Sequence, residues 1–215
     1  MKEKFNAYIH QPAFKKKMLV MLLGVLCMGV FLSFLIEVDM GTDPCTFMNV
    51  AISEKFGILF GTWQLILNAV LFIVVIIFDI KKIGPGTFAN MVFIGYISDF
   101  CRLVLWPRLL PKDIFTTFPA RGIIFAIAIV CFVIGASFYM NADMGVSPYD
   151  AFPVIIHDRL LKNISFKYVR MGYDFLVIII GCLVGGKPNI GIIVMALLLG
   201  PIITFVGKKL APYLK

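Results

Sequence analysis

Six long apolar runs constrain this chain more than any other feature of its sequence. They cover residues 18–38, 60–80, 86–106, 121–141, 166–186 and 188–205, approximately. Each is close to the roughly 20 residues that an α-helix needs to cross a bilayer. A soluble domain of 215 residues could not bury all of them in one core, since 60% of the residues are hydrophobic and 15% are charged. The sequence therefore predicts an all-α polytopic membrane protein with six transmembrane helices.

The basic residues between these runs predict how the helices are oriented. If the N-terminus is cytoplasmic, 14 of the 20 lysines and arginines fall in cytoplasmic segments and 6 fall outside. Cytoplasmic loops carry the excess of basic residues in membrane proteins. We therefore expect a cytoplasmic segment 1–17, an external loop 107–120 and a cytoplasmic tail 208–215. The polar segment 1–17 does not resemble a cleavable signal peptide.

The net charge of +8 has the same explanation. The basic residues lie between apolar runs and form no continuous stripe, which a nucleic-acid-binding surface would need. They act as topology signals, and we expect no nucleic-acid partner.

The two halves of the chain resemble each other at a spacing of 104 residues. Met40–Pro44 has the sequence M-G-T-D-P, and Met144–Pro148 has the sequence M-G-V-S-P. Cys27 aligns in the same way with Cys131. Each half contains three apolar runs, which is an odd number, so the second copy must enter the membrane in the opposite sense. This pattern predicts two inverted three-helix repeats, residues 18–106 and 121–207, an arrangement common in secondary transporters.

A short extra helix is predicted after the first run of each repeat, over residues 44–56 and 148–161, approximately. Aspartate or serine suits the N-cap position and proline suits the first helical position. These helices are too short to span the bilayer, and the sequence leaves open whether they lie in the interface or dip into the membrane. Their first residues could gate a pathway or could simply cap the helices; they are Asp43, Pro44, Thr46, Ser147, Pro148 and Asp150.

Asp174 is the leading candidate for a binding residue. It lies eight residues into the fifth run, which is a depth of about 12 Å in a helix. An acidic residue inside the membrane marks a functional interior by default. Its counterpart in the first repeat is Asn68, which would lie equally deep from the other side. The alternative is an ion pair between Asp174 and Arg170, one turn away, extended towards the cytoplasm.

The third run has one face of small and polar residues, among them Thr87, Asn90 and Asp99. Such a face should point into the protein, where it could line a cavity or let helices approach closely. We expect these three residues to bind substrate or an ion together with Asn68 and Asp174.

No pattern in the sequence predicts catalysis, a metal site or a cofactor. The five cysteines include no C-x-x-C pair, and the two histidines, His10 and His157, are far apart. The chain has neither a G-x-S-x-G motif nor a phosphate-binding G-x-x-x-x-G-K motif. We therefore expect the protein not to be an enzyme.

Several polar islands within the apolar runs resemble the YitT/YczE-like family of bacterial membrane proteins. They are M-G-T-D-P-C-T after the first run, I-G-P-G-T-F-A-N-M-V-F-I-G at the third, M-G-V-S-P-Y-D, M-G-Y-D and A-L-L-L-G-P-I-I. The resemblance covers most of residues 20–207 and implies a bacterial inner-membrane protein with a transport role. The chain departs from the family pattern at Ile192, where threonine is expected, and at Thr204, where an acidic residue is common. A strictly symmetric site is therefore not implied.

Three functions remain compatible with the sequence. The first is a small secondary transporter for a small molecule or ion, which works by alternating access around a polar site in the middle of the membrane. The second is a substrate-binding membrane subunit of an energy-coupled uptake complex, although the first run lacks an A-x-x-x-A docking motif. The third is a membrane accessory protein that scaffolds other proteins. The bilayer is the one partner common to all three, and a protein this small is compatible with a homodimer.

Overall fold

The computed structural model describes residues 13–213 of the chain, and within this range it contains helices and no strands. The helices are α2 (Phe14–Val38), α3 (Pro44–Phe56), α4 (Phe60–Asp79), α5 (Pro85–Phe100), α6 (Trp106–Leu109), α7 (Ala120–Asn141), α8 (Pro148–Arg159), α9 (Phe166–Val184) and α10 (Ile190–Leu210). The two short helices begin at the prolines from which they were predicted. Residues 1–12 of the expected N-terminal segment and residues 214–215 of the expected tail lie outside the described residues.

Five helical segments are long and apolar enough to cross a membrane. They are α2, α4 with its final 3₁₀ turn, α5 continued through a π-helical stretch into α6, α7 and α10. The prediction of an all-helical membrane protein is therefore confirmed. The helix α9 is 19 residues long, but its first half carries Lys167, Arg170 and Asp174.

The outward faces of the long helices fit a lipid environment. Leu19, Leu22 and Leu26 on α2 are 59%, 45% and 51% exposed. On α9, Leu183 is 79% exposed. Apolar surface on this scale is not stable in water, so lipid must cover it.

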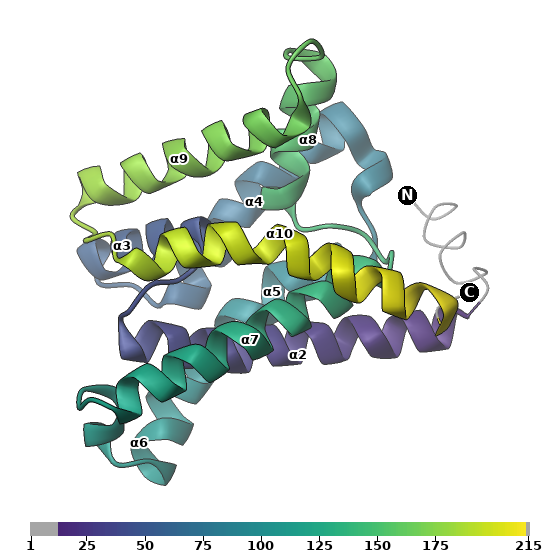
Figure 1. Cartoon of the computed structure of the whole chain (residues 1–215). Helices are drawn as coiled ribbons and strands as arrows, with labels where there is room; N and C mark the ends of the chain where they lie inside the picture. Colours follow the sequence, from purple (N-terminus) through teal and green to yellow (C-terminus); the bar gives the residue numbers. More distant parts are fainter. Residues whose placement is uncertain (1–12, 214–215) are drawn as a thin grey trace.

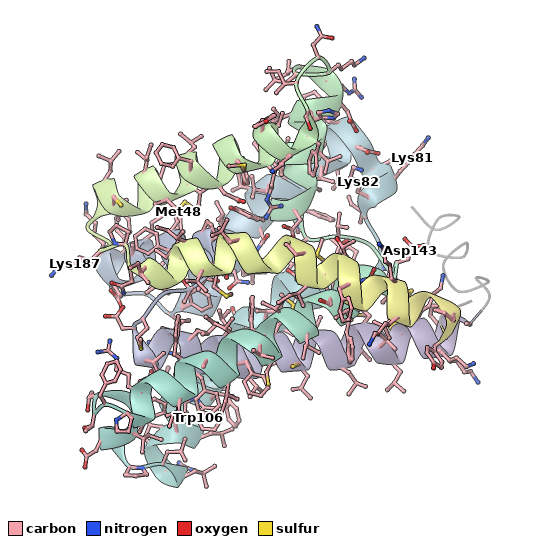
Figure 2. All side chains as sticks on the ribbon, viewed as in Figure 1. Met48, Lys81, Lys82, Trp106, Asp143 and Lys187 are labelled. Atoms are coloured by element: carbon pink, nitrogen blue, oxygen red, sulfur yellow. The ribbon has the colours of Figure 1, made fainter. Side chains whose placement is uncertain are left out.

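The charged turns gather at two opposite ends of the molecule. Lys81, Lys82 and Asp143 lie at one end, and Trp106 and Lys187 lie at the other (Figure 2). The helix α2 begins, and α10 ends, on the side of Lys81 and Lys82 (Figure 1). We call this side the first end and the opposite side the second end.

The helices, long and short, form two groups, each around its own apolar core. One core joins α2, α5, α7 and α10 through side chains such as Leu32, Ile94, Val133 and Met195. The other surrounds Met48 of α3 and includes residues of α4, α8 and α9. We call these groups the first lobe (α2, α5, α7, α10) and the second lobe (α3, α4, α8, α9). Figure 1 shows the second lobe above the first.

Each short helix is held by long helices from both halves of the chain. The helix α3 packs against α4 and α9, and α8 packs against the same two helices. Eight residues of α3 are buried, from Pro44 to Ser53. This burial places α3 among the other helices of the protein.

The first lobe is built on a close crossing of α2 and α7. A Cβ atom on Gly24 would lie 2.6 Å from the backbone nitrogen of Tyr139 and 2.7 Å from the carbonyl oxygen of Gly135. Nearby, the Cys27 thiol donates a hydrogen bond to the backbone carbonyl of Cys131, at 3.2 Å. Only glycine at position 24 lets the two backbones come this close.

The two lobes are joined by a close contact between α4 and α5. There, a Cβ atom on Gly95 of α5 would lie 2.6 Å from the Cα atom of Gly61 of α4. The Asp99 carboxylate also accepts a hydrogen bond from the Gly61 backbone N–H, at 2.7 Å. Between the described parts of α9 and α10 there is much less contact. Within the described residues, the lobes are therefore in close contact at α4 and α5 and in little contact at α9 and α10.

The turns that follow α2 and α7 have the same backbone form. Asp39 and Asp143 both have left-handed conformations, with φ of 45° and 55°. Two residues later, Gly41 and Gly145 have φ of 127° and 98°. L-residues with side chains rarely adopt such angles, so glycine is required at both positions.

The same two turns contact the last long helix of the opposite half of the chain, which is α5 or α10. The Gly86 N–H donates to the carbonyl oxygen of Met144 at 2.7 Å, and the Gly191 N–H donates to that of Met40 at 3.2 Å. Each turn thus ties its own half of the chain to the other half.

Candidate functional site

The starts of the two short helices carry matching polar caps. At α3, the Asp43 carboxylate accepts hydrogen bonds from the Thr46 N–H at 3.1 Å and from the Thr46 hydroxyl at 2.6 Å. At α8, the Ser147 hydroxyl accepts from the Asp150 N–H at 3.0 Å and donates to the Asp150 carboxylate at 2.7 Å. Capping fixes the position of both carboxylates relative to their helices.

Arg170 on α9 connects the cap of α8 to Asp174. Its Nη1 donates to Asp150 Oδ1 at 2.8 Å, and its Nε donates to Asp174 Oδ2 at 3.0 Å. The Tyr149 hydroxyl donates to Asp174 Oδ1 at 2.9 Å, and the guanidinium lies 5.4 Å from the centre of the Tyr149 ring. Because the Asp150, Arg170 and Asp174 side chains are 26%, 26% and 21% exposed, this network is accessible from outside the protein.

Asp43 belongs to the same electrostatic environment. The charges of Asp150 and Asp174 act on Asp43, and all three carboxylates and Arg170 act on Cys45 in the first turn of α3. We call Asp43, Asp150, Arg170 and Asp174 the central charge cluster. It contains three carboxylates and one guanidinium, so it is negative when all its members are ionised.

Aromatic side chains surround the cluster. The rings of Tyr149 and Tyr173 lie 4.9 Å apart, and the ring of Phe152 lies 5.7 Å from that of Tyr173. A further tyrosine, Tyr139 on α7, belongs to the core of the first lobe. The Tyr139 side chain is 1% exposed, and its hydroxyl has no hydrogen-bond partner among residues 13–213. Buried polar groups are rarely left unpaired.

Of the five residues expected to bind substrate or an ion together, Asp174 is the one found in this network within the described part of the chain. It shares Arg170 there with Asp150, which was expected to gate a pathway or to cap α8. The Arg170–Asp174 ion pair that was considered as the alternative role for Asp174 is present, but it is extended by Asp150 and Tyr149 into a larger network.

Asn68 lies elsewhere in the second lobe. It is 3% exposed, and its Nδ2 donates to the Gln64 carbonyl oxygen at 3.0 Å. Its Oδ1 has no partner among the described residues. Among the described residues, no hydrogen bond joins Asn68 to Asp174.

The three polar residues of α5 are all buried, and two of them make contacts between helices. The Thr87 hydroxyl donates to the carbonyl oxygen of Val146 at 2.8 Å and accepts from the Gly84 N–H at 3.1 Å. Asp99 accepts from Gly61 in the first turn of α4 and lies 4.0 Å from Arg102. Asn90 is 6% exposed. Thr87 and Asp99 thus fasten helices and turns together outside the central charge cluster.

Reasoning from the sequence missed the tyrosines of the cluster. A usable signal was present, since a tyrosine directly precedes each of the two acids in Pro148-Tyr149-Asp150 and Tyr173-Asp174.

A second polar region lies near the second end of the molecule. It is a pocket of about 410 Å³ between the end of α2, α3 and the turn from α9 to α10. Its charged and polar lining consists of Asp39, Thr42, Glu54, Arg102, Lys187 and Asn189. Because α3 lines this pocket with Phe47, Val50 and Ala51 and begins at the cluster, the same short helix borders both regions.

Comparison with known proteins places this architecture in a family. A region of 183 residues, 85% of this chain, is 26% identical to the uncharacterized membrane protein YczE of Bacillus subtilis and covers 81% of that protein. Another of 162 residues, 74% of this chain, is 25% identical to the uncharacterized protein YyaS of the same organism and covers 77% of it. An uncharacterized protein of Haemophilus influenzae is 23% identical over 192 residues, 88% of this chain and 83% of that protein.

No solved structure matches the chain. The model of a family of unknown function, DUF6198, matches residues 15–208. Because this match spans nearly the whole chain, the protein is a YczE-like membrane protein that belongs to the DUF6198 family.

Proposed function

We propose that this protein is a small secondary transporter of the bacterial inner membrane, not an enzyme, and that it moves a small solute by alternating access around the central charge cluster. The observation that carries the proposal is Arg170, held between Asp150 and Asp174 at the start of a short interior helix. Ionised groups in a membrane protein are costly and face interiors or water-filled paths. Short helices that begin inside the protein are also typical of transporter binding sites.

The proposed architecture has six transmembrane helices in two inverted repeats, with α9 as the sixth span. The matching turns at Asp39 and Asp143 and the reciprocal hydrogen bonds from Gly86 and Gly191 support the repeat. The reciprocal packing of α3 on α9 and of α8 on α4 supports it as well. The charges of α9 are compatible with a span, because Arg170 and Asp174 neutralise each other within the second lobe.

The first end is proposed to be cytoplasmic. It carries Lys81 and Lys82 (Figure 2), and cytoplasmic loops carry more basic residues. The helix α2 begins and α10 ends there (Figure 1), which puts both termini in the cytoplasm. In this orientation the pocket near Lys187 faces the exterior.

The difference between the two repeats suggests how access would alternate. The helices α4 and α5 are closed at Gly61 and Gly95, near the second end, whereas α9 and α10 are separated. In proteins with inverted repeats, access alternates by rocking one part against the other around a fixed site. We infer an inward-open state here, and an outward-open state in which α9 and α10 close and α4 and α5 part.

Cys45 provides a native reporter for this motion. It lies in the first turn of α3, half-buried, beside the charges of the cluster. We expect a variant whose other four cysteines are alanine to react with a membrane-impermeant thiol reagent from both faces of the membrane. The measurement compares labelling in right-side-out and inside-out vesicles. A matched control keeps only Cys101, which is 2% exposed and should react from neither face.

Labelling of Cys45 from one face alone would contradict alternating access. That result would favour the accessory-protein function, in which the cluster only holds α8 against α9. Copurification of an ATPase with the protein would instead favour the binding subunit of an energy-coupled uptake complex.

A further inference from the structure

We infer that the pocket near the second end of the molecule binds a small zwitterion, a compound that carries an ammonium group and an anionic group on one short skeleton. Neither the repeats nor the family relationship specifies a ligand for this pocket. The movement of the zwitterion across the membrane rests on the proposed function, whereas its binding can be tested separately. The evidence is the cavity, its apolar wall and two unpaired charges of opposite sign.

The pocket lies between the two lobes. Its volume of about 410 Å³ is within the range of small-molecule sites. The end of α2 and the start of α10 line it from the first lobe, and α3 lines it from the second. The turn from α9 to α10, marked by Lys187 in Figure 2, is fixed to the end of α2, because Asn189 Nδ2 donates to the Asp39 carbonyl oxygen at 3.0 Å and to Asp39 Oδ1 at 3.3 Å. A ligand here would contact both lobes.

The inner wall of the pocket is apolar and tightly packed. Leu35 and Ile192 are buried side chains of the first lobe. On α3, Phe47 and Ala51 pack against the turn from α9 to α10, since a Cβ atom on Gly186 would lie 2.9 Å from both side chains. Side chains packed this closely form a fixed wall, on which the aliphatic part of a small compound can rest.

Two of the four charges that line the pocket have partners within the protein. Arg102 Nε donates to Glu37 Oε1 at 2.9 Å, and the Asp39 carboxylate accepts the hydrogen bond from the turn. The other two are Glu54 on α3 and Lys187 in the turn, and both are exposed. In the described part of the chain they form no ion pair, either with each other or with a third residue.

Opposite charges that line one cavity without pairing are complementary to a zwitterion. An ammonium group beside Glu54 and an anionic group beside Lys187 would each gain a charged partner. An ion of one sign fits less well, because an anion would share the cavity with Glu54 and Asp39, and a cation would share it with Arg102 and Lys187. A free amino acid has the required pair of charges, and so does the ethanolamine headgroup of a lipid.

Leucine and its two singly charged analogues test the inference on the full-length protein in detergent. We expect millimolar leucine to raise the melting temperature more than isoamylamine, which lacks the carboxylate, or isocaproate, which lacks the ammonium group, because a ligand of the folded state stabilises it. Glu54→Gln and Lys187→Gln should each weaken the affinity for leucine about fivefold, the effect of losing one exposed ion pair.

Lys55→Gln is the matched control. Lys55 is exposed in the last turn of α3, directly after Glu54, and it does not line the pocket. This variant should bind leucine like the native protein. Phosphoethanolamine, the soluble form of the lipid headgroup, separates the two sources of the zwitterion: a stabilisation larger than that by leucine, and reduced in the same two variants, would assign the site to a lipid.

Two results would overturn the zwitterion site. One is that neither leucine nor phosphoethanolamine stabilises the protein more than isoamylamine and isocaproate do. The other is that Glu54→Gln and Lys187→Gln respond to both zwitterions like the native protein. Labelling of Cys45 from both faces would then still support transport, whereas leucine binding with Cys45 labelled from one face alone would leave a binding site without transport.

Discussion

Replacing Arg170 with alanine should destabilise the protein by about 2–4 kcal/mol, somewhat less than removing one partner from a fully buried ion pair. The reason is that Asp150 and Asp174 would lose the only guanidinium that joins them and would then repel each other and Asp43. The contact between α8 and α9 should loosen first, because Arg170 connects these two helices. Thermal unfolding of the purified protein, followed by size-exclusion chromatography, measures the effect.

A second substitution separates charge from packing. Arg170→Ala combined with Asp174→Asn should recover part of the lost stability, because one unpaired carboxylate is removed. Arg159→Ala is the control, since Arg159 is exposed and its partner in the described part of the chain is Phe78, through the carbonyl oxygen and the ring; it should change the stability little. Equal effects of Arg170→Ala and Arg159→Ala would show that the central charge cluster contributes nothing to the fold.

Gly24→Val should cost about 3 kcal/mol, as expected for overpacking of a tight contact. The new Cβ atom would lie 2.6 Å from the backbone nitrogen of Tyr139 and 2.7 Å from the carbonyl oxygen of Gly135. Backbone atoms of a helix cannot turn aside as a flexible side chain can, so α2 and α7 must separate. The change should appear as a lower melting temperature and a smaller yield of monodisperse protein.

Gly172→Val tests whether any larger residue in a membrane helix has the same effect. Gly172 lies within α9, and a Cβ atom there would meet nothing within 4 Å. This variant should keep the native melting temperature within a few degrees. A Gly24→Val protein as stable as the Gly172→Val protein would mean that the close crossing of α2 and α7 does not exist in the membrane.

Most of the helices could be predicted from the sequence, because their lengths and ends depend on local features. Apolar runs fixed the positions of the spans, and Pro44 and Pro148 marked the starts of the short helices. The largest differences lie at the ends of the chain, where α2 begins at Phe14 and α10 continues to Leu210. Both additions contain lysines, which a helix extending beyond the apolar layer tolerates.

The composition of the site could be predicted only in part. Depth along a helix singled out Asp174 as a candidate, but depth does not say which neighbour a side chain faces. Asn68 and Asp174 lie on α4 and α9, and each of the short helices α3 and α8 packs against both of these helices. The hydrogen bond from Arg170 to Asp150 also depends on how the chain turns back between α8 and α9. No local pattern in the sequence encodes that turn.

The measurement that tests alternating access most directly is the distance between the start of α9 and the end of α10 in lipid. Tyr168 and Phe205 are exposed, at 65% and 58%, and each can be replaced by a spin-labelled cysteine in a background without native cysteines. Electron–electron double resonance should then give two populations of distances, the longer from the open state described above and the shorter from a state with α9 and α10 closed. A single narrow population of distances would contradict alternating access.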